Sequence, residues 1–422
     1  MSRPTLSLAM IVKNEEDWLA GALESVQGLV DEMVVVDTGS TDATVEIAEQ
    51  HGARIVFHAW QDDFSDARNA ALDAVISDWV LVLDADERLV RDDFPIVRSL
   101  IEKPMADAYN CRIISVAEEA ENLSEAQVTR LFRRDSRIRW RNRVHEQVLP
   151  SLFENQLTLV KSDVRILHHG YVAAMIESRN KVDRNRLLVE KMAAEQPNEP
   201  YWPFQMAQTC MQAKEGADAI KWAKKAMKLV KPRSDMAPLC LVTLGRAYWA
   251  AGDLHRARQV FDNGTRDYPD YTDLYYFSGQ VAYAAGHYAS ATKAFLKAIS
   301  LGTPTRYLQT DTGVGTFKPW WQLYLVAMAQ ADYSRAHAYL ILLLACQPLF
   351  RKAWTALATL TVDFRPEDVL QTLEQHLPRA TIIETLSQWS NLTPAETRML
   401  QTAKKAGDAP YGKVDNAAQV GA

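Results

Sequence analysis

The chain has 422 residues and a formal net charge of −6, with 48% hydrophobic and 24% charged residues. This length allows two domains with full cores, and the composition is that of a globular protein rather than a disordered one. The acidic balance argues against a general binder of nucleic acids or anionic membranes, so any anion must be met by a local basic cluster. The 4 scattered cysteines fit a reducing cytosol. We find no signal-peptide pattern and no bilayer-length apolar run, and we expect a cytoplasmic protein without a transmembrane segment.

Four strand-like runs near the N-terminus alternate with helical patterns. They cover Leu6–Val12, Met33–Val36, Arg54–Phe57 and Trp79–Leu83. Strands and helices in this alternation predict an α/β domain with a mostly parallel sheet and right-handed crossovers. Such sheets bind their ligands beyond the carboxyl ends of the strands, so the polar residues that follow each run are the candidate site.

The last of these runs ends in two carboxylates, Asp84 and Asp86. One or two carboxylates together with substrate phosphates are the usual ligands of Mg²⁺, and Mn²⁺ accepts the same oxygen donors. An isolated Asp-x-Asp is a weak signal, and a solvated loop cap is its alternative interpretation. The chain has no glycine-rich dinucleotide motif and no phosphate-loop motif. A nucleotide-sugar held by carboxylates and a metal ion therefore fits these residues better.

Four motifs, in this order along the chain, resemble glycosyltransferase family 2. They are Ser7–Glu16, Val34–Asp42, Ser65–Asn69 and Asp84–Glu87. The resemblance implies a GT-A-like (Rossmann-like) nucleotide-diphosphosugar fold and an inverting transfer from a nucleotide-sugar. It also implies a UDP-linked donor and a divalent cofactor, Mn²⁺ or Mg²⁺.

The same resemblance gives a role to single residues in these motifs. By position, Glu15 and Asp37 would contact base and ribose, Arg68 the base or diphosphate, Asp84 ribose or metal, and Asp86 the metal as its principal ligand. Two of them also have a purely structural interpretation. Arg68 can be a surface arginine on a helix, and Asp37 can belong to a helix-capping turn.

Seven arginines lie between Arg130 and Arg143, in an otherwise acidic chain. Such a cluster can meet a diphosphate or an anionic acceptor. A solvated pair of strands with alternating arginines accounts equally well for most of them, and we favour that interpretation.

Two further positions resemble catalytic residues of the family. An acceptor that attacks the anomeric carbon must lose a proton to a base. Family 2 enzymes place an acidic residue at a similar distance after the Asp-x-Asp, so Glu146 is the expected base and His145 the alternative. The commoner Glu-Asp pair of the family is His-Glu here, and a turn salt-bridged to the arginines is the structural alternative. A late histidine completes the metal shell in related enzymes, and we favour His168 over His169.

The second half of the chain loses its strand signals and gains a period of about 34 residues. Small residues and aromatics recur in the tetratricopeptide pattern, most clearly at Leu244–Pro269 and Gly279–Ala298. A weaker copy precedes them at Ala207–Ala226, and another follows at Ala336–Pro348. We therefore predict an all-α solenoid of tetratricopeptide repeats over 191–405, after a catalytic domain over 1–190. The tail, 406–422, is expected to be disordered. The extra length at Thr303–Pro319 predicts an insertion that packs on the repeats or reaches the catalytic cleft.

These features together predict a metal-dependent inverting glycosyltransferase that moves a hexose or N-acetylhexosamine from a UDP-sugar. Repeats of this type bind extended peptides in a groove, which favours a protein or peptide acceptor. A saccharide, lipid-linked or lipopolysaccharide-core acceptor is the alternative within this class. An inactive transferase that acts as a binding scaffold is the alternative outside it. The repeats also allow a homo-oligomer.

Overall fold

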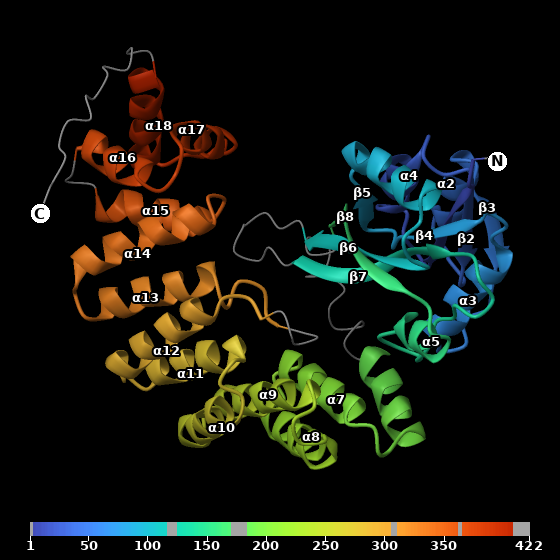
Figure 1. Cartoon of the computed structure of the whole chain (residues 1–422), viewed down its shortest axis with the longest axis horizontal. Coiled ribbons are helices and arrows are strands. Elements are labelled where there is room, and N and C mark those ends of the chain that lie inside the picture. Colours follow the sequence, from blue (N-terminus) through green and yellow to red (C-terminus); the bar gives the residue numbers. More distant parts are fainter. Residues whose placement is uncertain (1–2, 116–124, 170–183, 305–309, 362–364, 408–422) are drawn as a thin grey trace, which may run out of the picture. The chain divides into compact units, whose positions relative to one another are not determined.

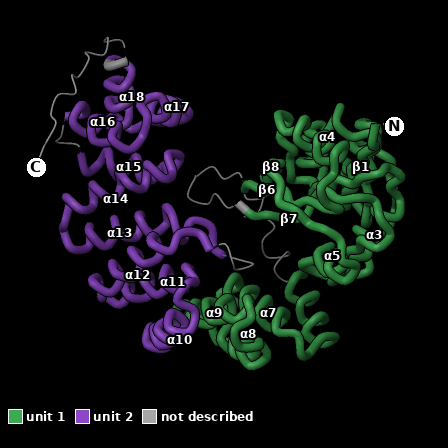
Figure 2. The backbone as a smooth tube through the Cα atoms, viewed as in Figure 1, with its two compact units in different colours: residues 1–253 green, residues 254–422 purple. Residues whose placement is uncertain are grey.

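The computed structural model of the chain describes residues 3–115, 125–169, 184–304, 310–361 and 365–407. The chain divides into two compact units, Met1–Asp253 and Leu254–Ala422 (Figure 2). The first unit contains the α/β domain and the first helices of the helical region. The expected boundary near residue 190 falls inside this unit, and a catalytic domain over 1–190 stays a prediction. The predicted disordered tail lies outside the described residues from 408 onward.

One sheet forms the centre of the α/β domain, with strand order β3-β2-β1-β4-β7-β6-β8-β5 (Figure 1). The strands are β1 (Leu6–Val12), β2 (Glu32–Asp37), β3 (Arg54–Phe57), β4 (Trp79–Val82), β5 (Glu87–Leu89), β6 (Ala108–Ser115), β7 (Glu125–Arg133) and β8 (Leu159–His168). Strands β3, β2, β1 and β4 are parallel neighbours, whereas β7 runs antiparallel to both β4 and β6. The described sheet is mixed and mostly parallel, which confirms the predicted fold class.

Both faces of the sheet are buried, because the side chains of β1 alternate between two cores. Leu6, Leu8 and Met10 belong to a core shared with helices α1 (Leu19–Val26) and α4 (Phe94–Glu102). Ala9 lies in the opposite core, with residues of α3 (Phe64–Ala74) and α5 (Leu149–Glu154). A strand buried on both faces reads as a nearly continuous apolar run, and β1 is broken only by the buried Ser7. Its bounds could therefore be predicted from the sequence.

The loops that follow β1 and β2 lie side by side at the carboxyl edge of the sheet. Val12 and Asp37 are register partners at the ends of these strands. Asn14, with φ 54°, donates its backbone N–H to Ser40 Oγ (2.9 Å), and its side-chain Oδ1 accepts from the N–H of Thr41 (2.8 Å). The two motifs that contain Glu15 and Asp37 are thus tied together by hydrogen bonds.

Within each unit, helices that follow one another in the helical region pack together in pairs such as α7 (Tyr201–Gln212) with α8 (Gly216–Leu229) and α11 (Thr272–Ala284) with α12 (Tyr288–Leu301). The helices α7, α8 and α9 (Met236–Ala250) belong to the first unit. Those of the second unit are α10 (Leu254–Asp267), α11, α12, α13 (Phe317–Ala329), α14 (Tyr333–Cys346), α15 (Arg351–Leu360), α16 (Pro366–Glu374), α17 (Arg379–Ser387) and α18 (Pro394–Gly407). Within the described residues, none of the helices is both long and apolar enough to cross a membrane.

Close approach of paired helices explains the small residues of the repeat pattern. Gly279 of α11 faces Phe295 of α12, and a Cβ at this glycine would lie only 2.6 Å from Cε1 of the ring. Any larger side chain would therefore force the Phe295 ring or one of the two helices to shift. The repeat positions read from the sequence are contact positions in the structure.

A buried carboxylate attaches the predicted insertion to the second unit. Asp273, in the first turn of α11, is 3% exposed and accepts hydrogen bonds from Thr310 Oγ1 (2.5 Å) and the backbone N–H of Asp311 (2.7 Å). Lys318 forms an ion pair with Asp311 (3.1 Å). The described part of the insertion thus packs against the repeats, whereas residues 305–309 lie outside the described part of the chain.

This attachment predicts a pH-dependent stability of the second unit. Burial raises the pKa of Asp273 to about 6, although the hydrogen bonds from Thr310 and Asp311 oppose the shift. Because the pKa of Asp273 is raised in the folded state, its contribution to the free energy of unfolding is fully present below pH 3.8. This contribution is lost as the pH rises through 6. The shift in pKa corresponds to a change of roughly 3 kcal/mol in the free energy of unfolding.

We expect Asp273→Asn to remove this dependence, because the amide keeps an acceptor oxygen and cannot ionise. Urea unfolding between pH 4.5 and pH 7.5 should show wild type losing stability relative to the variant as the pH rises. Asp267→Asn, on the exposed side of α10, is the matched control. If the difference in free energy of unfolding between the wild type and Asp273→Asn stays constant with pH, Asp273 does not cause the dependence.

Candidate active site

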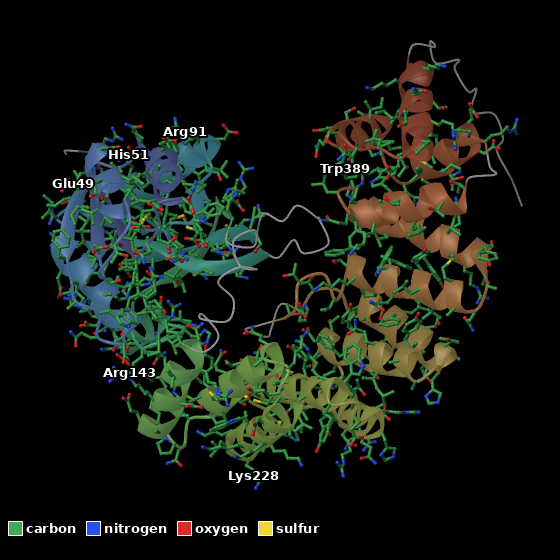
Figure 3. All side chains as sticks on the ribbon, turned by 180° about the vertical axis from the view of Figure 1, so that it is seen from behind. Glu49, His51, Arg91, Arg143, Lys228 and Trp389 are labelled. Carbon is green, nitrogen blue, oxygen red and sulfur yellow. The ribbon has the colours of Figure 1, made fainter. Side chains whose placement is uncertain are left out.

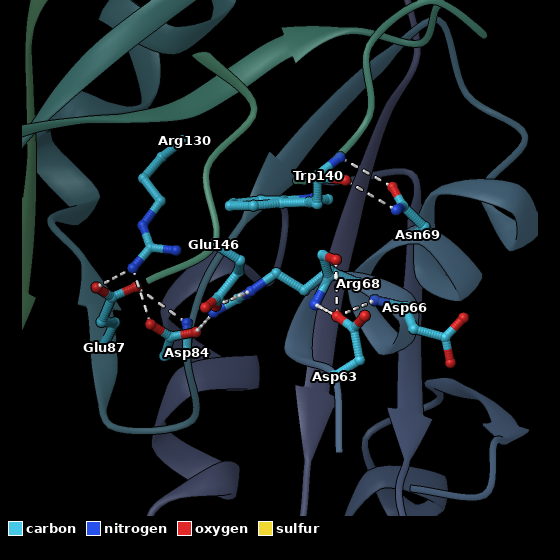
Figure 4. Close-up of polar contacts among 10 residues, drawn as sticks. Asp63, Asp66, Arg68, Asn69, Asp84, Glu87, Arg130, Trp140 and Glu146 are labelled. Atoms are coloured by element: carbon cyan, nitrogen blue, oxygen red, sulfur yellow. Dashed lines mark hydrogen bonds and ion pairs between the residues drawn. The ribbon is translucent and has the colours of Figure 1, made fainter. Parts of the chain in front are cut away.

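Two arginines and three carboxylates form a connected ion network at the carboxyl end of β4 (Figure 4). Arg68, from α3, donates from Nη2 to Asp84 Oδ1 (2.7 Å) and from Nε to Glu146 Oε1 (2.7 Å). Arg130, from β7, donates from Nη2 to Asp84 Oδ2 (2.8 Å) and to Glu87 Oε1 (2.7 Å). The predicted site residues Arg68, Asp84 and Glu146 are therefore brought together by direct contacts.

The motif Ser65–Asn69 positions Arg68 through local contacts. Asp63 caps α3 by accepting the backbone N–H groups of Ser65 (2.8 Å) and Asp66 (3.1 Å). Asn69 exchanges two hydrogen bonds with the backbone of Trp140, and the Arg68 guanidinium lies over the ring of this tryptophan at 4.8 Å. The cap thus sets the start of the helix, and the tryptophan platform sets the direction of the arginine.

Burial determines the electrostatics of the network. The side chains of Arg68 and Arg130 are each 9% exposed, and that of Glu87 is 2% exposed. Burial alone would raise the pKa of Asp84, but the charges of Arg130 and Arg68 outweigh it and hold this pKa well below its usual range. Burial raises the pKa of Glu87 in spite of Arg130. Asp84 therefore stays ionised, with both of its oxygens engaged by arginines.

Asp86 and His168 face each other beside this network. His168 ends β8 and is the register partner of Glu87 in β5, so the sheet places it next to the residue that follows Asp86. The distance from Asp86 Oδ2 to His168 Nε2 is 3.3 Å. The hydrogen bond to Asp86 raises the pKa of His168 above its ordinary value, against the effect of burial. The neighbouring His169 donates its backbone N–H to the Asp86 carbonyl oxygen (2.8 Å) and stacks on Trp18.

The donor set of this pair fits a divalent ion such as Mn²⁺. A carboxylate oxygen and an imidazole nitrogen are both acceptable to Mn²⁺, and imidazole is less suited to Mg²⁺. No group of three or more potential metal-ligating side chains occurs within the described residues. Asp86 and His168 would therefore supply two ligands, and phosphate oxygens and water would complete the shell.

Asp37 lies buried in a turn at the end of β2. Its carboxylate accepts the backbone N–H groups of Gly39 (3.0 Å) and Ser40 (3.1 Å), and Gly39 has φ 106°. These contacts agree with the capping-turn interpretation. Glu15 is half-buried, and its backbone N–H donates to Thr44 Oγ1 (2.7 Å). The roles of both residues toward base and ribose stay predictions.

The arginine cluster is largely engaged in contacts within the protein. Beyond Arg130, its members bind carboxylates or a carbonyl oxygen: Arg133–Asp107, Arg134–Ser77 O, Arg137–Asp135, Arg139–Asp73, Arg141–Glu154 and Arg143–Glu195. Sequence reasoning missed the partners of Arg130, Asp84 and Glu87. Glu87 could have been found from its place in the motif Asp84–Glu87. The sequence of β7 does not indicate that Arg130 is the buried arginine of the cluster.

The first helices of the helical region support the loop that carries Glu146. Val144 shares a core with Trp202 of α7 and with Met192 of the helix over 184–195. Burial raises the pKa of Tyr201, and the nearby charge of Glu146 adds to this shift. The Glu146 side chain is itself 13% exposed, whereas the adjacent His145 is exposed and has φ 53°. Glu146 is thus the fixed member of the pair and His145 the solvent-facing one.

Comparison with known proteins identifies the two parts of the chain. Residues 7–154 match the model of glycosyl transferase family 2, and residues 242–304 match that of the tetratricopeptide repeat. The α/β domain is a member of glycosyl transferase family 2. Every residue of the ion network and Asp86 lie inside the matched range of this family 2 domain, whereas His168 follows it.

Two relatives match most of this chain. A TPR repeat-containing protein of Synechococcus elongatus is 34% identical over 259 residues, which are 60% of this chain and 64% of that protein. The SPbeta prophage-derived glycosyltransferase SunS of Bacillus subtilis is 25% identical over 288 residues, 66% of this chain and 67% of SunS. The chain thus matches about two-thirds of the length of these relatives.

Among solved structures, S. aureus TarS 1-349 in complex with UDP-GlcNAc is 16% identical, with a TM-score of 0.38. The likeness covers 61% of this chain and 90% of that one. It is too remote to bear on the ligand of the family 2 domain.

The network predicts a large loss of stability when Arg130 is removed. We expect Arg130→Met to lower the free energy of unfolding of the first unit by about 3–5 kcal/mol, because Glu87 and Asp84 lose the cation that neutralises them. Arg141→Met, at an exposed pair with Glu154, is the control and should have a much smaller effect. Urea unfolding measures both.

A second substitution tests whether the charge of Glu87 causes this loss. Arg130→Met combined with Glu87→Gln should cost less than the sum of the two single variants, because the uncompensated carboxylate is gone. Additive losses would mean that the two side chains are not coupled.

Proposed function

We propose that this protein is a metal-dependent glycosyltransferase that transfers a hexose or N-acetylhexosamine from a UDP-sugar to a protein or peptide acceptor, with inversion. The observation that carries the proposal is the juxtaposition of two groups at one edge of the sheet. The Asp86–His168 pair has a metal-ligand donor set. Glu146 is held by Arg68, which also binds Asp84, two residues before Asp86 in the chain.

Asp86 and His168 would hold the divalent ion. When bound, such an ion neutralises the charge that develops on the leaving nucleoside diphosphate. Glu15 and Asp37, on the two joined loops of the same edge, would contact the nucleoside. Asp84 and Arg68 would keep the network rigid, so that the donor meets groups already in place.

Glu146 would act as the general base. Its Oε1 accepts from Arg68 Nε, whereas Oε2 accepts no hydrogen bond from any described residue. The free oxygen can take the proton of the acceptor while the acceptor atom bonds to the anomeric carbon and the bond to the diphosphate oxygen breaks. The acceptor atom attacks the anomeric carbon from the face opposite the leaving diphosphate oxygen, so the configuration of this carbon inverts.

The acceptor class is supported by the helical region. Tetratricopeptide repeats present extended concave surfaces that suit extended peptides. One relative is named a TPR repeat-containing protein and another a glycosyltransferase. A saccharide or lipid-linked acceptor is the alternative. A non-catalytic scaffold is a second candidate, because both oxygens of Asp84 are already paired within the protein.

Nucleotide binding separates an enzyme from a scaffold. We expect UDP with Mn²⁺ to raise the melting temperature of the wild type by several degrees, since a ligand at 100 times its Kd adds about 2.7 kcal/mol. Asp86→Asn should lose the part of the shift that requires Mn²⁺, and Asp92→Asn, at an exposed carboxylate nearby, should keep it. A wild type that responds to no nucleoside diphosphate would favour the scaffold.

Glu146→Gln tests the base. The amide can still accept from Arg68 but cannot take a proton, so UDP binding should persist while UDP release from a UDP-sugar falls by about 10²- to 10⁴-fold. Glu154→Gln, on the exposed side of α5, is the matched control. Full turnover in Glu146→Gln together with loss in His145→Ala would assign the role to the histidine instead.

A further inference from the structure

Four lysines form one exposed face of α8. Lys221, Lys224, Lys225 and Lys228 are spaced three, four and seven residues apart, so they lie on the same side of the helix. All four side chains are exposed, and Lys228 points away from the packed helices (Figure 3). We call these four residues the lysine face.

The charge of the lysine face is not neutralised by neighbouring carboxylates. None of its amino groups is within ion-pair distance of a carboxylate in the described part of the chain, although Lys224 lies over the ring of Tyr248 (5.6 Å) and Lys225 over that of Trp222 (4.9 Å). The sequence from 219 to 234 contains six basic residues and no acidic one. In a chain of net charge −6, this is a local concentration of positive charge.

The arginine cluster of the α/β domain differs from the lysine face in its partners. Its members have carboxylate or carbonyl partners within the protein, so they serve the fold. Among the residues that the structure describes, the lysine face has no such partners, and like charges three and four residues apart destabilise a helix slightly. A charge arrangement that does not help the fold is available for an external anionic partner.

The shape of the surface favours an extended partner over a discrete anion. The hollow beside the lysine face measures about 470 Å³ and is lined by residues of α8 alone, the four lysines with Ala217 and Ile220. It is therefore a shallow surface rather than a groove between helices. Lysines are flexible, strongly hydrated point charges, whereas sites for a single phosphate or carboxylate favour the rigid fork of arginine.

A lipid bilayer fits these properties best. Clusters of four to eight basic residues on a helix favour binding to anionic lipids, whose head groups move laterally to meet them. Trp222 flanks the lysine face, and tryptophan is enriched at membrane interfaces. The shallow hollow, lined by α8 alone, gives an acidic peptide no groove to enter.

We propose that the lysine face of α8 docks this protein on the anionic surface of a lipid bilayer. The contact is peripheral and reversible, and it depends on the salt concentration because it is electrostatic. It uses residues of α8 only and stands independently of the proposed transferase activity.

Vesicle sedimentation of the full chain tests the proposal. We expect binding to vesicles of phosphatidylcholine with 30% phosphatidylglycerol, no binding to pure phosphatidylcholine, and weaker binding as salt is raised. Each lysine near such a surface contributes about fivefold in affinity, so the triple variant Lys221→Gln, Lys225→Gln, Lys228→Gln should bind about 100-fold more weakly. Circular dichroism checks that the variant is folded.

A matched control removes the same charge elsewhere. Lys103→Gln, Lys161→Gln and Lys293→Gln replace three other exposed lysines and should leave vesicle binding within about twofold of the wild type. A wild type that ignores the anionic vesicles would overturn the proposal. So would equal losses in the two triple variants, or a fluorescent single-stranded oligonucleotide that binds the lysine face more tightly than the vesicles. Asp86→Asn should sediment like the wild type, which separates this result from the test of transferase function.

Discussion

The contact of the Arg68 guanidinium with Asp84 and Glu146 joins the main elements of the candidate site. It connects α3, the end of β4 and the loop after β7, three segments that are far apart in the sequence. Removing an arginine from water carries a large desolvation cost, so the burial of Arg68 is tolerated only because carboxylates meet two of its nitrogens. The same contact fixes Glu146 relative to the strand end. The position of the candidate base is therefore a consequence of the folding of the sheet.

Features that depend on local sequence could be predicted well. The strand β1 was found with its bounds because both of its faces are buried, and the edge residues followed from the rule that parallel strands end together. The repeat pattern likewise follows from small residues at helix contacts, as at Gly279. These signals are contained in short stretches of chain, and no long-range contact is needed to recognise them.

Features that depend on pairing between distant segments could not be predicted. Arg130 meets Asp84 and Glu87 because β7 lies antiparallel beside β4, with Val80 opposite Phe132. The sequence does not predict this register, so Arg130 could not be distinguished from the other arginines of the cluster. The same limit applies to Asp84, whose two arginine contacts were not expected. The pairing of Asp86 with His168 was expected from the family resemblance, and the neighbouring register of β5 and β8 gives its physical reason.

The core that Val144 shares with Trp202 and Met192 has a consequence for the modular history of the chain. Repeat arrays usually gain and lose units at their ends, because each unit contacts only its neighbours. Here the first helices are structural neighbours of the loop that carries Glu146 as well as of the array. Recombination that exchanged the array near residue 190 would leave this loop without its support, whereas exchange after Asp253 would leave it intact. The helices α7 to α9 are thus expected to have been inherited together with the transferase fold, while the later repeats were free to diversify.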